Sequence, residues 1–106
     1  MSDPQIDGDD GDGDDGFDAG NTALAPTAAA VLAHIVTSIV DNPEAVEVDA
    51  SEHRGRVRLD VRVGPGDLGR VIGRRGRTAQ SIRTVVRAAA TRDDASADVD
   101  VEFIDD

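Results

Sequence analysis

Apolar residues recur along this chain with the two spacings that distinguish helices from strands. Between residues 28 and 40 they recur every three or four positions, which predicts an amphipathic α-helix. Its expected buried face consists of Leu32, Ile35, Val36 and Ile39. Thr27 is the expected N-cap, and Asp41-Asn42-Pro43 ends the helix because the residue before a proline avoids helical geometry.

Three later stretches alternate apolar and polar residues, which is the pattern of strands with one buried and one solvated face. They span residues 46–51, 56–63 and 99–103. The connection over residues 52–55 is short enough to make the first two strands an antiparallel hairpin.

Two more helices are expected between the second and third strands. Asp67 is expected to cap a short helix over residues 68–72, and a longer one runs from a glycine-flanked loop at residues 73–76 to about Ala90. The long helix is expected to bury Ala79, Ile82, Val85, Val86 and Ala89. A polar loop, residues 91–97, follows it. The order α-β-β-α-α-β predicts a two-layer α+β domain, in which three helices cover one face of a three-stranded sheet.

Composition changes sharply at the start of this domain. Residues 1–26 consist mainly of Asp and Gly and have little to bury. They cannot offset the entropy of ordering, so they are expected to form a disordered acidic tail, with the domain over residues 27–106. The tail holds eight aspartates and no basic residue, and it contributes −8 to the net charge of −11.

The basic residues are equally concentrated. All 11 arginines lie between Arg54 and Arg92, where Asp60 and Asp67 are the only acidic residues, so this segment carries +9. The chain has no lysine, which fits either adaptation to high salt or a biased genome. A local basic segment is the electrostatic footprint that nucleic-acid binding requires, whatever the net charge of the chain.

Several other classes of function lack the residues they need. The chain has no cysteine, no lysine for a Walker motif and no nucleophile–histidine–carboxylate set, so neither an enzyme nor a cofactor is expected. His34 and His53 are interpreted as a helix-surface residue and a turn residue, not as metal ligands. No apolar run approaches the length of a membrane-spanning helix and the acidic N-terminus is unlike a signal peptide, which predicts a cytoplasmic protein.

A G-x-G-x-x-G pattern at residues 64–69 follows a strand and precedes a helix, as in dinucleotide-binding folds. Three observations oppose that interpretation. Asp67 lies where a pyrophosphate would bind, the helix is interrupted at Gly73, and residues 84–92 hold no acidic residue for a ribose. Folds that stack RNA bases on exposed aromatic residues are also excluded, because the only aromatic residues are Phe17 and Phe103.

The loop Gly73-Arg74-Arg75-Gly76 is the strongest candidate for a site. Two glycines this close would weaken a continuous helix by roughly 1 kcal/mol each, which favours a tight turn between two helices. The glycines leave the backbone uncovered and the arginines place positive charge beside it. This combination suits a sugar-phosphate chain lying against the protein.

The wider sequence around this loop, DNPE at residues 41–44 and DLGRVIGRRGRT at residues 67–78, resembles the KhpA family of small bacterial KH-domain proteins. The resemblance implies a type II KH fold and a non-catalytic protein that binds single-stranded RNA, as an RNA chaperone or post-transcriptional regulator. It also implies pairing, with a second copy or with a larger KH companion of the KhpB/Jag type. The alternative is a protein-interaction module in which pairing is the main role and RNA contact is secondary.

The resemblance also carries site roles over by position. The implied RNA-binding residues are Arg70, Val71, Ile72, Gly73, Arg74, Arg75, Gly76, Arg77 and Thr78. In this set the glycines would admit the RNA backbone and the arginines would contact phosphates. Val71 and Ile72, with the apolar side of the following helix, would form the floor of a groove for bases.

Charged residues outside the loop have their own interpretations. Arg83 and Arg87, one turn apart on the long helix, could extend the track of phosphate contacts. Arg56 and Arg58 lie on the outer face of a strand and are expected to form cross-strand ion pairs. The acidic tail is either a solubilising segment or a competitor of RNA phosphates for the arginines.

Overall fold

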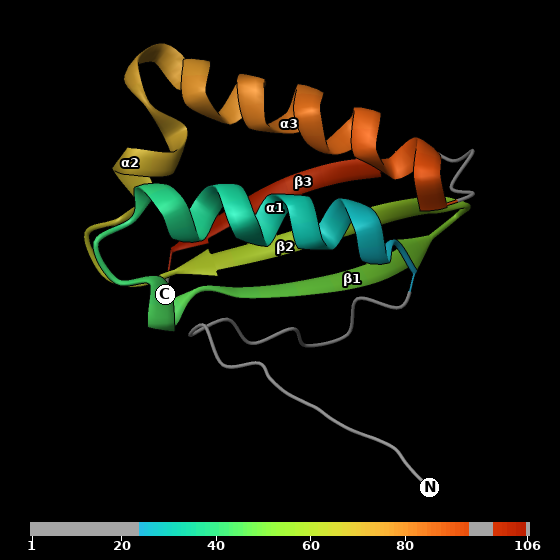
Figure 1. Cartoon of the computed structure of the whole chain (residues 1–106), viewed down its shortest axis with the longest axis horizontal. Coiled ribbons are helices and arrows are strands. Elements are labelled where there is room, and N and C mark those ends of the chain that lie inside the picture. The colour runs from blue at the N-terminus through green and yellow to red at the C-terminus, as the bar shows by residue number, and fades with distance from the viewer. Residues whose placement is uncertain (1–23, 94–98, 106) are drawn as a thin grey trace, which may run out of the picture.

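A computed structural model gives the fold, and it describes residues 24–93 and 99–105. Three helices, α1 (Pro26–Ile39), α2 (Leu68–Ile72) and α3 (Arg77–Ala90), lie on one face of a sheet (Figure 1). The strands are β1 (Glu47–His53), β2 (Arg56–Val63) and β3 (Val99–Asp105). Single 3₁₀ turns η2 (Pro43–Ala45), η3 (Arg74–Gly76) and η4 (Thr91–Asp93) connect them. The predicted α+β order is confirmed.

The sheet has the strand order β1-β2-β3, so β3 is an edge strand. β1 and β2 form the predicted antiparallel hairpin, with Val48 opposite Val61, while β2 and β3 are parallel, with Leu59 opposite Val101. Parallel neighbours need a crossover connection, and α2, η3 and α3 supply it. The hairpin turn is tighter than predicted because both residues that close it, Arg54 and Gly55, have positive φ.

The core lies between the sheet and the helices. The inward residues of the predicted strand alternation are buried as expected except Phe103, which is partly buried, and the largest fully buried side chains are leucine and valine, among them Leu32 and Leu59. Two residues predicted to be buried are exposed, Ile39 at 37% and Val85 at 49%. The helices α1 and α3 pack side by side, and both contribute alanines to the core.

The start of α1 also differs from the prediction. Ala25 is the N-cap residue and Thr27 lies inside the first turn, so Thr27 does not cap the helix. The backbone N–H groups of Thr27 and Ala28 instead donate to the two carboxylate oxygens of Asp93, at 2.8 and 2.9 Å. A residue 66 positions away thus satisfies donors that the helix leaves unpaired.

Two predictions extend beyond the described residues. The disordered tail was expected over residues 1–26, of which only 24–26 are described, and the polar loop over 91–97 is described only as far as η4. Within the described ranges, none of the helices is both long and apolar enough to cross a membrane.

Candidate nucleic-acid interface

The loop at residues 73–76, called the GRRG loop below, reverses the chain between α2 and α3. Gly73 (φ 75°, ψ 176°), Arg75 (φ 58°) and Gly76 (φ 74°) all have positive φ. The N–H of Gly73 donates to the carbonyl of Gly69 at 2.9 Å, and the N–H of Gly76 donates to the carbonyl of Gly73 at 3.2 Å. The first bond ties the loop to α2, and the second closes the loop on itself.

The two glycines of the loop have different surroundings. A Cβ added at Gly73 would lie 2.7 Å from the Cβ of Thr78 and 3.0 Å from its backbone nitrogen. A Cβ at Gly76 would meet nothing within 4 Å. Thr78, in the first turn of α3, therefore packs against the inside of the loop, whereas the backbone at Gly76 is open to an approaching ligand.

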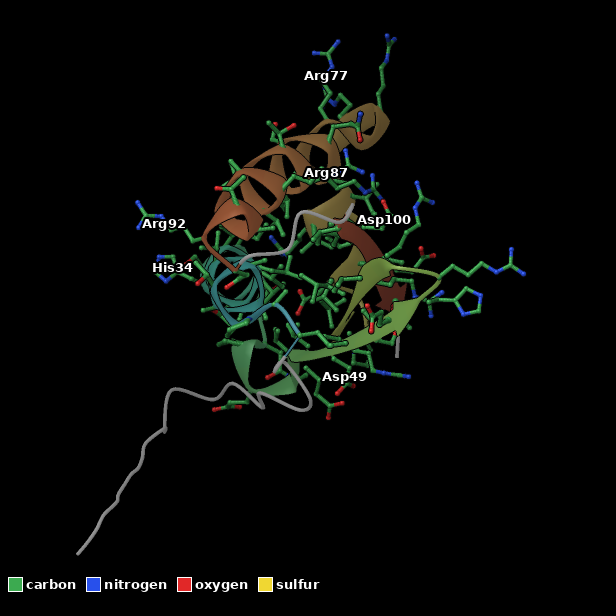
Figure 2. All side chains as sticks on the ribbon, turned by 90° about the vertical axis from the view of Figure 1, so that its right-hand side faces the viewer. His34, Asp49, Arg77, Arg87, Arg92 and Asp100 are labelled. Atoms are coloured by element: carbon green, nitrogen blue, oxygen red, sulfur yellow. The ribbon has the colours of Figure 1, made fainter. Side chains whose placement is uncertain are left out.

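Positive charge gathers on the outside of the loop. Arg74, Arg75 and Arg77 are exposed, and none of them forms an ion pair with a residue in the described ranges. Figure 2 shows Arg77 pointing away from the body of the molecule. The loop also leads into the N-terminus of α3, which no side chain caps, so the helix dipole adds partial positive charge there. This arrangement suits an anion beside the loop.

Arg70 differs from these three arginines. Its Nη2 atom lies 2.9 Å from Asp41 Oδ2 and its Nε atom lies 3.4 Å from Asp67 Oδ1. Asp67, predicted to cap α2, stands at the N-cap position without a side-chain capping bond. Its carboxylate accepts hydrogen bonds from the backbone of Asp41 and Asn42 instead.

The two apolar residues before the loop differ in how deeply they are buried. Val71 is completely buried in the core, and Ile72 is partly buried against it. Of these two residues of the implied groove floor, Val71 therefore lies beneath the surface, and Ile72 is the one that offers apolar area to a ligand.

The remaining arginines on α3 contact the edge of the sheet. Arg83 Nε donates to the carbonyl of Val101 at 3.3 Å, and the guanidinium lies 5.2 Å from the centre of the Phe103 ring. Arg87 Nε donates to the carbonyl of Val99 at 3.1 Å and pairs with Asp100 (Figure 2). Both arginines thus cover the free edge of β3.

Of the two arginines predicted to form cross-strand ion pairs on the outer face of the sheet, Arg56 does so and Arg58 pairs within its own strand. Arg56 pairs across strands with Asp100 at 3.9 Å, whereas Arg58 pairs with Asp60 of its own strand at 2.9 Å. His34 and His53 are both exposed. No group of three or more possible metal ligands is found in the described part of the chain.

Sequence reasoning missed the roles of Asp41, Asp67 and Asp93. Asp67 directly precedes a helix, so the sequence predicts that it caps that helix. Its hydrogen-bond partners instead lie 25 and 26 residues earlier in the chain. Nothing in the local sequence distinguishes a capping aspartate from one that binds a distant backbone.

Comparisons of this chain with a family model and with known proteins point to the same family. The chain matches the family described as KhpA/KhpB, KH domain, over residues 29–101. It is 53% identical over 74 residues to the RNA-binding protein KhpA of Streptomyces coelicolor, covering 69% of this chain and 92% of the relative. It is 59% identical over 63 residues to the protein of that name from Leifsonia xyli, covering 58% of this chain and 82% of the relative. No solved structure gives a significant match.

Proposed function

This chain belongs to the KhpA/KhpB KH-domain family, a non-enzymatic family, and on that premise we propose that it binds single-stranded RNA through the GRRG loop. The observation that carries the proposal is the loop itself. Three exposed arginines without ion pairs in the described ranges surround an uncovered glycine backbone at the start of α3. Backbone and arginine donors of this kind bind phosphate oxygens and fix the register of a nucleic acid.

In this proposal Arg74, Arg75 and Arg77 contact phosphates, and Gly76 admits the RNA backbone. Gly73 and Thr78 hold the shape of the loop, and Ile72 supplies apolar contact. We place the activity in the cytoplasm, as an RNA chaperone or post-transcriptional regulator that acts without cutting RNA. The names of the relatives, RNA-binding proteins, support the binding partner.

A second role is pairing with another copy or with a KhpB/Jag-type companion. Val85 on α3 and Ile39 at the end of α1 are exposed apolar residues, and a contact made through these two helices would bury them. In this role RNA contact would be secondary.

Charge reversal in the loop tests the first role. We expect Arg74→Asp/Arg75→Asp to weaken binding of a fluorescein-labelled random 12-nucleotide RNA at least about tenfold at 50 mM salt. Fluorescence anisotropy measures the affinity, and analytical ultracentrifugation of both proteins measures self-association. Because each phosphate contact on a single strand contributes about 0.7 to the slope of log affinity against log salt, the slope should also fall by about 1.4.

The chain offers a matched control for this variant. Arg54→Asp/Arg92→Asp changes the net charge equally at two exposed positions, one in the hairpin turn and one in η4 directly after the C-terminal end of α3, and Arg54 shares the left-handed backbone of Arg75 (φ 55° and 58°). The hairpin turn lies at the opposite end of α3 from the GRRG loop (Figure 1). Equal losses in the two double variants would mean that net charge, not the loop, carries the binding. Intact RNA affinity with lost self-association after reversal in the loop would favour the pairing role.

A further inference from the structure

The start of α2 is attached to the turn after α1 through a buried carboxylate. Asp67 is the only buried charged residue in the described ranges, with 2% exposure. Its Oδ1 accepts the N–H of Asp41 and its Oδ2 accepts the N–H of Asn42, both at 3.1 Å. A charge is retained in such a position only where it is paired and hydrogen-bonded, and these donors meet that requirement.

Arg70 adds a second attachment between the same segments. Its guanidinium bridges two carboxylates, since it contacts Asp41 at 2.9 Å and Asp67 at 3.4 Å. Gly64, at the end of β2, brings the chain against η2, because a Cβ there would lie 3.1 Å from the Cβ of Ala45. Two hydrogen bonds and one ion pair thus join the segment before the GRRG loop to the turn that follows α1.

We propose that Asp41, Asp67 and Arg70 form a clasp that positions the GRRG loop for RNA, so that Arg70 is a positioning residue and not a phosphate ligand. This inference rests on the proposed function. The helix α2 has only five residues, too few to be stable alone, so its direction is set by tertiary contacts. The loop is bonded to that helix through Gly73, and it therefore follows any shift of α2.

The dependence of affinity on salt distinguishes positioning from phosphate contact. Loss of a phosphate ligand lowers the slope of log affinity against log salt by about 0.7, whereas loss of a positioning residue weakens binding similarly at every salt concentration. Because the Arg70–Asp41 pair is exposed, we expect Arg70→Gln to weaken RNA binding about two- to fivefold with an unchanged slope. Arg74→Gln, measured alongside, should reduce the slope.

Asp41 gives the sharper test, because the clasp and simple electrostatics predict opposite signs. Removing an acidic residue near the loop should tighten RNA binding if charge alone matters. We expect Asp41→Asn to weaken binding of the labelled 12-nucleotide RNA about two- to fivefold instead, with the slope unchanged. Glu44→Gln is the matched control, since Glu44 is an exposed acid on the same turn and pairs with no residue in the described ranges.

The double variant Asp41→Asn/Arg70→Gln completes the cycle, and circular dichroism checks that each variant is folded. We expect the double variant to lose no more affinity than Arg70→Gln alone. The reason is that Asp41→Asn removes the contact between Asp41 and Arg70, which Arg70→Gln has already broken. Tighter binding in Asp41→Asn, or fully additive losses, would overturn the clasp. If Arg74→Asp/Arg75→Asp also binds normally, the proposed RNA site is wrong; if only the clasp variants bind normally, the clasp alone is wrong.

Discussion

At the scale of single residues, backbone conformation explains why the GRRG loop contains two glycines. Both have positive φ, but Gly73 also has ψ 176°, a region that only glycine occupies readily, and Gly76 has ordinary left-handed geometry. Gly73 is in addition enclosed by Thr78. The sequence assigned both glycines to close approach of RNA, whereas the contacts of Gly73 are inside the protein.

This difference predicts unequal effects of alanine. We expect Gly73→Ala to lower the free energy of unfolding by more than about 2 kcal/mol, because it adds a clash with Thr78 to the backbone strain. Gly76→Ala should cost about 1 kcal/mol, the strain of a left-handed alanine alone. Urea denaturation followed by circular dichroism measures both values, and equal losses would contradict the steric role of Thr78.

At the scale of elements, the sequence pattern predicts the strand alternation and the ends of α2 and α3 well, but it assigns the wrong residues to the caps of the helices. Every second residue of β2 from Val57 to Val63 is buried as the pattern requires, because burial in a strand follows from a local period. Helix ends obey a different logic, since any nearby acceptor can satisfy the free N–H groups. For α1 that acceptor is Asp93, and packing between α1 and η4 brings it there.

The arginines of α3 also have partners that a local sequence pattern cannot predict. The spacing of Arg83 and Arg87 correctly places them on one side of the helix, and from this the sequence suggested a longer phosphate track. Their hydrogen bonds go to carbonyls of β3 because that strand forms the open edge of the sheet. Strand order depends on long-range pairing, which no local pattern contains.

The cap on α1 predicts a pH dependence of stability. Burial of the Asp93 carboxyl raises its pKa, but hydrogen bonds from Ala28 and Thr27 outweigh that effect and hold the pKa below its usual range. A lowered folded pKa stabilises the protein above the unfolded value of about 3.9, and this stability is lost as the pH falls through the folded pKa. We therefore expect Asp93→Asn, which keeps only one of the two acceptor oxygens, to cost about 1 kcal/mol at pH 7.

The same two proteins compared at low pH give the check on this prediction. Urea titrations of wild type and Asp93→Asn should differ less at pH 3 than at pH 7, because below a pH of about 3.9 the carboxyl of the unfolded chain binds a proton more readily than the folded one. Glu47→Gln, at an exposed position on β1, is the control for removal of a carboxylate. A difference that does not change with pH would mean that the charge of Asp93 does not stabilise the start of α1.

At the scale of the whole molecule, opposite charges are separated along the chain. Residues 1–26 carry −8, residues 27–106 carry −3, and the segment from Arg54 to Arg92 carries +9. A polyanion that binds the arginines must approach a protein whose net charge repels it. Electrostatic repulsion of this kind is screened by salt, with a Debye length of about 10 Å at 0.1 M.

Deleting residues 1–23, which contain all eight aspartates of the tail, tests whether the tail opposes RNA binding. The cut leaves Ala25, which is buried and accepts the first hydrogen bond of α1 from Ala29. We expect the shortened chain to bind the 12-nucleotide RNA about three- to tenfold more tightly at 20 mM salt and less than twofold more tightly at 300 mM. Anisotropy titrations at both salt concentrations measure the effect.

A full-length variant separates charge from chain length in this experiment. Replacing the eight tail aspartates with asparagine keeps the length and removes the charge, so it should reproduce the tighter binding of the shortened chain at low salt. If the asparagine variant instead binds like the wild type, the charge of the tail has no part in the effect. If neither variant differs from the wild type at 20 mM salt, the tail does not compete with RNA, and the interpretation of a solubilising segment holds.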